Sequence, residues 1–170
     1  VFPPVADFVK EKLYDDEELH CEVAKLKMDF MTRAQSLIHG DLHTGSIFIN
    51  QDTTMVFDPE FCFYGPMGYD IGNVIANMIF AWCNGDAAGN KEFCTWVESV
   101  IVDVVDLTMK KMRAYYDEHV TDTMCKNKAY EDYYMDTILA DTSAVSGLEM
   151  IRRIVGMANV KDITTIADQD

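Results

Sequence analysis

The stretch of sequence that decides the fold reads His39-Gly40-Asp41-Leu42-His43-Thr44-Gly45-Ser46. A second acidic motif, Asp58-Pro59-Glu60, follows a short distance along the chain. Apolar runs at 47–49 and 55–57 lie between the motifs, on either side of the turn-rich segment 50–53, and this pattern predicts strand, turn and strand. Such a hairpin would bring Asp41 and Asp58 to the same end of two neighbouring strands.

Three acids beside one hairpin suit phosphoryl transfer, in which the protein positions the reactants and offsets charge. One carboxylate accepts the proton of the attacking hydroxyl, and others hold the magnesium ions that bridge the nucleotide phosphates. The structural alternative is that Asp41 caps a turn and Asp58 ends a strand, which are common places for Asp. Two motifs joined by a hairpin favour the catalytic interpretation.

The two motifs resemble the catalytic loop and the metal-binding segment of the protein-kinase-like phosphotransferases. His-Gly-Asp, where protein kinases carry His-Arg-Asp, is similar to the small-molecule branch that contains the aminoglycoside and choline kinases. Within that branch, residues 39–46, 58–77 and 149–156 look most like the S-methyl-5-thioribose kinases. The resemblance implies a methionine-salvage enzyme that transfers the γ-phosphate of ATP to the anomeric hydroxyl of S-methyl-5-thioribose.

The resemblance also assigns roles to the acidic residues. Asp41 matches the catalytic base, and Asp58 and Glu60 match the D-x-E ligands of magnesium. Ser46 stands where most kinase-like enzymes place an Asn that holds a second magnesium, so it is the third expected metal ligand. ATP and Mg²⁺ are the implied cofactors.

Asp70 precedes an apolar helical pattern, where an Asp can serve as the N-cap. In the resembling fold the Asp at this point braces the catalytic loop instead, and we prefer that role. His39 and His43 would share a face only on a helix, whereas Gly40 and Gly45 indicate a loop. We expect both histidines to support that loop through hydrogen bonds, since a zinc site would lack nearby Cys ligands.

The Arg152-Arg153 pair lies within a largely apolar helical segment of an acidic chain. Guanidinium groups fit phosphate in two-point contact and offset the charge that develops on a transferred group. The alternative is a pair of surface salt bridges to Asp and Glu. The resemblance favours substrate and phosphate binding, because thioribose kinases carry paired arginines at this point.

Composition limits the partners. The net charge of −15 disfavours nucleic acid and anionic membrane, and it would repel ATP unless metal ions and arginines offset it. The five cysteines contain no C-x-x-C pair, which fits reduced thiols in a cytoplasmic protein. The longest apolar run, 71–83, is too short to span a bilayer, and no secretory signal is visible.

We expect residues 1–170 to form a single domain that is mainly α with a small β-hairpin, the C-terminal lobe of the protein-kinase-like fold. Helices are expected at 15–35, 69–84, 90–119 and 144–158, with a loop at 58–69. The segment ahead of His39 carries no Gly cluster, so the N-terminal ATP-binding lobe is expected to be absent from this chain, which alone would be inactive. The resemblance also implies a homodimer.

Two other functions stay open. One is a related aminoglycoside or choline-type kinase of another small alcohol. The D-x-E motif and the paired arginines do not suit a polycationic aminoglycoside. The other is a non-catalytic remnant that acts as an interaction module. Retention of every expected acid argues against a remnant, and the missing lobe argues for it.

Overall fold

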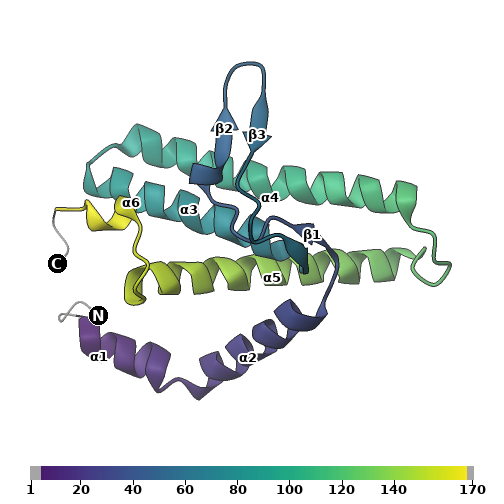
Figure 1. Ribbon diagram of the computed structural model, residues 1–170, viewed down its shortest axis with the longest axis horizontal. Helices are drawn as coiled ribbons and strands as arrows, with labels where there is room; N and C mark the ends of the chain where they lie inside the picture. The colour runs from purple at the N-terminus through teal and green to yellow at the C-terminus, as the bar shows by residue number, and fades with distance from the viewer. Residues whose placement is uncertain (1–4, 168–170) are drawn as a thin grey trace.

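The computed structural model describes residues 5–167, which form a mainly helical body from which a β-hairpin projects (Figure 1). In chain order the elements are α1 (Ala6–Val9), the π-helical turn η2 (Lys10–Tyr14), α2 (Glu17–Thr32), β1 (Ser36–Ile38), the 3₁₀ turn η3 (Thr44–Ser46), β2 (Ile47–Ile49), β3 (Thr54–Val56), β4 (Phe63–Gly65), α3 (Gly68–Ala87), α4 (Lys91–His119), α5 (Lys128–Val155) and α6 (Lys161–Thr164).

Two small antiparallel sheets organise the motif region. β2 pairs with β3 as the predicted hairpin, with Phe48 opposite Met55, although β3 begins one residue earlier than expected. β1 pairs with β4, with Leu37 opposite Tyr64. The sequence did not predict this second pair, because 36–38 was assigned to no element and 63–65 to the loop expected at 58–69. The segment from β1 to β2 and the segment from β3 to β4 therefore connect the same two sheets and must run side by side.

The ends of α3 and α4 follow local capping signals. α3 ends at Ala87, after which Gly89 adopts a φ of 72° and reverses the chain. The Asn90 side chain then accepts the backbone N–H of Phe93 at 3.1 Å and begins α4. The break expected between these two helices is confirmed, within a few residues at each end.

The helix expected at 144–158 is wrong in its extent, because α5 starts much earlier, at Lys128. Asn127 caps it by accepting the backbone N–H of Tyr130 at 2.9 Å. The first turns of α5 carry charged residues, so the sequence there shows no clear apolar pattern. Glu131 is nevertheless buried, and its carboxylate pairs with the guanidinium of Arg113 at 2.8 Å. Charge pairing thus lets a polar segment pack as helix.

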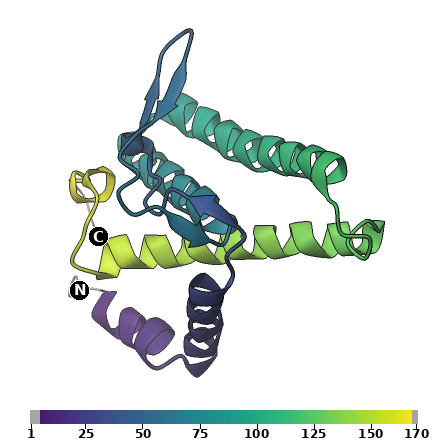
Figure 2. The same cartoon turned by 45° about the vertical axis from the view of Figure 1, so that its right-hand side comes forward.

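The core lies where α3 packs on α5. Gly68 and Gly72 permit a close approach, since an added Cβ at either would come within 2.7 Å of α5 backbone atoms. The largest fully buried side chains are Phe80, Val97, Met135 and Ile138. By contrast, α4 and α5 lie closest to each other near the loop that joins them and diverge away from it (Figure 2). None of the helices in residues 5–167 is long and apolar enough to cross a membrane.

Candidate active site

The two motif segments are joined at the base of the hairpin. His39 Nε2 lies 2.9 Å from the carbonyl oxygen of Phe57, and the N–H of Phe57 donates to the carbonyl of Ser46 at 3.1 Å. Gly40 has a φ of 84°, and a Cβ there would lie 2.3 Å from the carbonyl oxygen of Phe61. The loop that carries Asp41 therefore lies directly against the segment that carries the second motif, and only glycine fits at position 40 without strain.

Asp70 lies in the first turn of α3 and reaches back to the same loop. Its carboxylate accepts the backbone N–H of His39 at 2.6 Å and that of Gly40 at 3.0 Å. The N-cap position of α3 belongs to Met67 instead. These hydrogen bonds therefore brace the loop against α3, and they satisfy the backbone N–H groups of His39 and Gly40.

His43 is bonded within its own loop. Its Nδ1 accepts the N–H of Gly45 at 3.0 Å, so the proton of the neutral ring resides on Nε2. Nε2 lies 3.2 Å from the hydroxyl oxygen of Ser46, to which it donates. Ser46 is only 4% exposed. Its hydroxyl therefore contacts His43 inside the loop, and the expectation that it binds metal stays a prediction.

The three acids differ in accessibility. Asp41 is half-buried, and its N–H points to His39 Nδ1 at 3.4 Å. Asp58 and Glu60 are exposed, and Asp58 has a φ of 65°, a left-handed conformation that is uncommon outside glycine. Across residues 5–167, no group of three or more His, Cys, Asp and Glu side chains is close enough to hold a metal ion.

Two exposed carboxylates nevertheless suit magnesium. Mg²⁺ prefers oxygen ligands, retains several waters and is commonly bound by one or two carboxylates together with substrate phosphates. Asp58 and Glu60 offer that donor set on one short segment, whereas the Ser46 hydroxyl is buried against His43.

The paired arginines share one acidic partner. Arg153 Nε donates to Glu149 at 2.6 Å, and its guanidinium also reaches the carbonyl of Ala158 at 3.3 Å. Arg152 Nε contacts the other oxygen of Glu149 at 3.0 Å. The side chain of Arg153 is 17% exposed and that of Arg152 is 53% exposed. Arg152 is therefore the member of the pair that can meet an external anion, while Arg153 is committed to the fold.

Tyr69, which was not singled out from the sequence, lies at the start of α3 beside Asp70. Its ring packs 4.9 Å from that of Phe30. Burial raises the pKa of the Tyr69 hydroxyl, and the charges of Arg152, Glu149 and Asp41 also act on it. The hydroxyl is thus within electrostatic reach of both the arginine pair and the motif loop. Its place beside Asp70 was the only available sequence signal.

A second set of contacts, which the sequence did not predict, ties α2 and α5 to the motif loop. Arg33, just after α2, donates to Asp141 of α5 and to Asp29, each at 2.6 Å. Burial raises the pKa of Asp141, while Arg33 pulls it down. Two residues later, the Gln35 side chain accepts the N–H of Met67 at 3.0 Å. These bonds fix the N-terminal end of β1, which leads directly into the motif loop.

The helical body, the projecting hairpin and the braced loop are those of the protein-kinase-like fold, as the sequence predicted. Residues 5–97 match the family model described as "Phosphotransferase enzyme family", and the chain belongs to that family.

Among curated proteins the chain is similar to methylthioribose kinases, so the resemblance stated from the motifs is confirmed. It is 38% identical to methylthioribose kinase 1 of Oryza sativa subsp. japonica, over 97% of this chain and 42% of that protein. Identity to the methylthioribose kinase of Geobacillus thermodenitrificans is 37%, over 94% of this chain and 39% of that protein. Identity to the methylthioribose kinase of Bacillus cereus is 35%, over 99% of this chain and 42% of that protein. The chain thus spans about two fifths of the length of these relatives.

Proposed function

We propose that this chain is the catalytic-loop lobe of a small-molecule kinase that transfers the γ-phosphate of ATP to the anomeric hydroxyl of S-methyl-5-thioribose in methionine salvage. The observation that carries the proposal is the contact between the His-Gly-Asp loop and the Asp-Pro-Glu segment, made through His39, Gly40 and Phe57. The names of the relatives support the choice of substrate. An ATP-binding lobe completes the enzyme, which we place in the cytoplasm as a homodimer.

Asp41 is the proton acceptor in this proposal. A carboxylate within hydrogen-bond reach of the attacking hydroxyl takes its proton as the bond to phosphorus forms. The brace from Asp70 and the contact from the His39 ring hold the backbone on the N-terminal side of Asp41. A fixed backbone limits the positions that the carboxylate samples, which favours a productive approach.

Asp58 and Glu60 are the proposed magnesium ligands, and the bound ion would supply charge neutralisation at the nucleotide phosphates. The segment that carries these carboxylates packs against Gly40 through Phe61, so it lies beside the loop that carries Asp41. Arg152 is the proposed phosphate contact, since over half of its side chain is exposed. Glu149, which also pairs with Arg153, holds Arg152 in place from the same helix.

The test uses the complete enzyme, made by joining this chain to the ATP-binding lobe of a methylthioribose kinase. Formation of the sugar phosphate from methylthioribose, ATP and Mg²⁺ is followed, with this chain alone as the reference. We expect turnover by the complete enzyme and little by the lobe alone. A complete enzyme that ignores methylthioribose but phosphorylates an aminoglycoside or choline would overturn the substrate.

Asp41→Asn tests the proton acceptor. It should lower kcat by a factor on the order of 10² to 10⁴ while the unfolding midpoint stays unchanged. Asp52→Asn is the matched control, because Asp52 is an exposed Asp in the turn of the hairpin. Equal activity of the two variants would show that Asp41 is structural.

A non-catalytic interaction module is the second candidate. It is favoured by the apolar side chains that the hairpin exposes, with Phe48 63%, Ile49 75% and Met55 62% accessible. In that case the complete enzyme would transfer no phosphate to any of the three acceptors, and Phe48→Ser would abolish capture of the ATP-binding lobe supplied as a separate chain. Phosphate transfer that is lost in Asp41→Asn decides for the kinase.

A further inference from the structure

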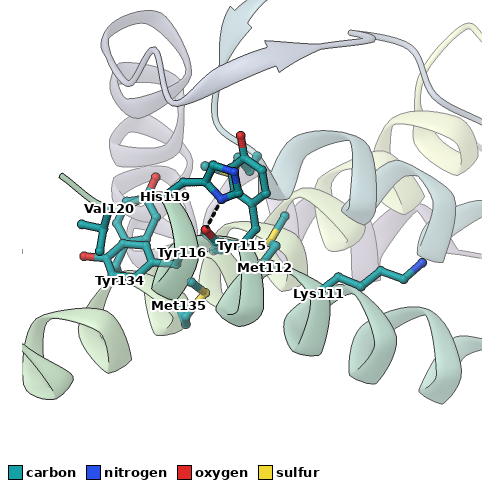
Figure 3. Close-up of a pocket in the computed structure, with 10 residues that line it drawn as sticks. Lys111, Met112, Tyr115, Tyr116, His119, Val120, Tyr134 and Met135 are labelled. Carbon is teal, nitrogen blue, oxygen red and sulfur yellow. Dashed lines mark hydrogen bonds between the residues drawn. The ribbon is translucent and has the colours of Figure 1, made fainter. Parts of the chain in front are cut away.

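An open cavity of about 510 Å³ lies between α4 and α5, apart from the proposed active site (Figure 3). It is lined by the last turns of α4 and the first half of α5, near the loop that joins them, and by Met67 just ahead of α3. The volume falls within the range of pockets that hold small organic molecules, about 300–1,000 Å³. Its lining combines aromatic rings with thioethers, principally those of Tyr115, Tyr116, Tyr134, Met67, Met112 and Met135.

Three charged or polar groups at the cavity, those of Lys111, His119 and Tyr116, are directed elsewhere. Lys111 extends along α4 with its ammonium away from the other labelled side chains (Figure 3). The His119 ring stacks on Tyr115 with centroids 3.9 Å apart, and its Nδ1 is 3.0 Å from the Tyr115 carbonyl. The Tyr116 hydroxyl donates to the carbonyl of Cys125 at 2.9 Å. An ion entering the cavity would lose water without gaining a charged partner, whereas a flat apolar ring would gain aromatic and thioether contacts.

The inner wall of the cavity adjoins the supports of the motif loop. Met67 lines the cavity, and its N–H donates to the side chain of Gln35, which immediately precedes β1. Asp70, one turn further along the same helix start, holds the N–H groups of His39 and Gly40. A molecule that packs on Met67 would therefore press on the end of α3 that braces the loop.

We propose that this cavity is a binding site for an uncharged aromatic small molecule, whose binding orders the α3 brace of the motif loop. The site is independent of the proposed phosphoryl transfer, because it shares no residue with the acids or the arginine pair. The proposal can therefore be tested on the chain itself, without turnover.

The experiment titrates the chain with 2-naphthol and follows methionine methyl groups labelled with ¹³C. The methyl resonances of Met67, Met112 and Met135 should shift together, while those of the exposed Met28, Met55 and Met124 should stay in place. Naphthalene-2-sulfonate is the charged analogue, which the cavity should bind at least tenfold more weakly, on the order expected for an unpaired charge. Shifts spread over all six methionines would overturn the site.

Tyr115→Ala removes one aromatic wall and should weaken 2-naphthol binding by about tenfold. Tyr115 is 66% exposed, so the variant should fold. Tyr133→Ala is the matched control, because Tyr133 is 62% exposed on α5 and lies outside the cavity. Equal binding by the two variants would overturn the assignment.

The effect on the brace is read from amide hydrogen exchange at His39 and Gly40. Saturating 2-naphthol should slow exchange at both amides, and the effect should disappear in Tyr115→Ala. Binding with unchanged exchange would overturn the link to the loop. The α4–α5 surface around the cavity could instead join two copies of the chain. In that case sedimentation will show a dimer that Tyr115→Ala dissociates, and 2-naphthol will not bind. This result overturns the proposal.

Discussion

The motif loop and the arginine pair, the two charged parts of the proposed site, are held in different ways. The loop at 39–46 depends on partners far along the chain, namely Asp70 at a separation of 31 residues and Phe57 at a separation of 18. The arginines depend on Glu149, which lies three and four residues earlier on the same helix. The loop geometry therefore exists only when α3 and the hairpin are in place, whereas one helical turn is enough to set the arginine pair.

The strongest way to break the loop is Gly40→Ala. The new side chain would meet both an unfavourable φ of 84° and the carbonyl of Phe61, so we expect a loss of about 3 kcal/mol in the free energy of unfolding. Urea denaturation of the purified chain measures it.

Gly89→Ala is the matched control for that variant. Gly89 has a similar φ of 72°, but a Cβ there would have no neighbour within 4 Å. Only the backbone strain remains, so the expected loss is about 1 kcal/mol. Equal losses at the two positions would mean that the contact with Phe61 does not constrain the loop.

A smaller effect is expected when the brace is removed by Asp70→Ala. The N–H groups of His39 and Gly40 would lose a charged acceptor, which should cost about 2 kcal/mol and speed amide exchange at these two positions. Glu92→Gln is the control, since Glu92 is also an acid in the first turn of a helix, but exposed. It should cost less than about 0.5 kcal/mol. Unchanged exchange at His39 and Gly40 would contradict the brace.

The same contrast explains what could be predicted from the sequence. The hairpin, the start of α3 and the break before α4 depend on residues within a few positions of one another, and their patterns indicated them. The pairing of β1 with β4 and the contact of Arg33 with Asp141, 108 residues apart, depend on the packed fold and left no local signal. The first half of α5 was missed because Glu131 is polar in sequence yet buried by pairing with Arg113 and Lys128.

For the site, residue identity indicated the acids and the arginines, but it could not show which of their side chains are exposed. Ser46 and Asp58 are equally polar in sequence, yet one hydroxyl is buried against His43 and the other side chain is exposed. Arg152 and Arg153 are identical residues at adjacent positions, and only their placement on the helix separates an exposed guanidinium from a half-buried one. Burial depends on the neighbouring elements, which is why the exposed side chains could be identified only from the structure.

The arginine pair combines an effect like that of the brace with the smallest one expected. Arg153→Gln removes the less exposed partner of the buried Glu149 and should cost about 2 kcal/mol in unfolding free energy. Arg152→Gln should cost less than about 0.5 kcal/mol, because its guanidinium is largely in water and Arg153 still pairs with Glu149. The same change should nevertheless reduce phosphate transfer in the complete enzyme, since the exposed guanidinium is the proposed phosphate contact. If Arg152→Gln destabilises the chain more than Arg153→Gln does, the anion-binding role would belong to Arg153. If the Arg152→Gln enzyme keeps its kcat and KM, the role would be removed from the pair.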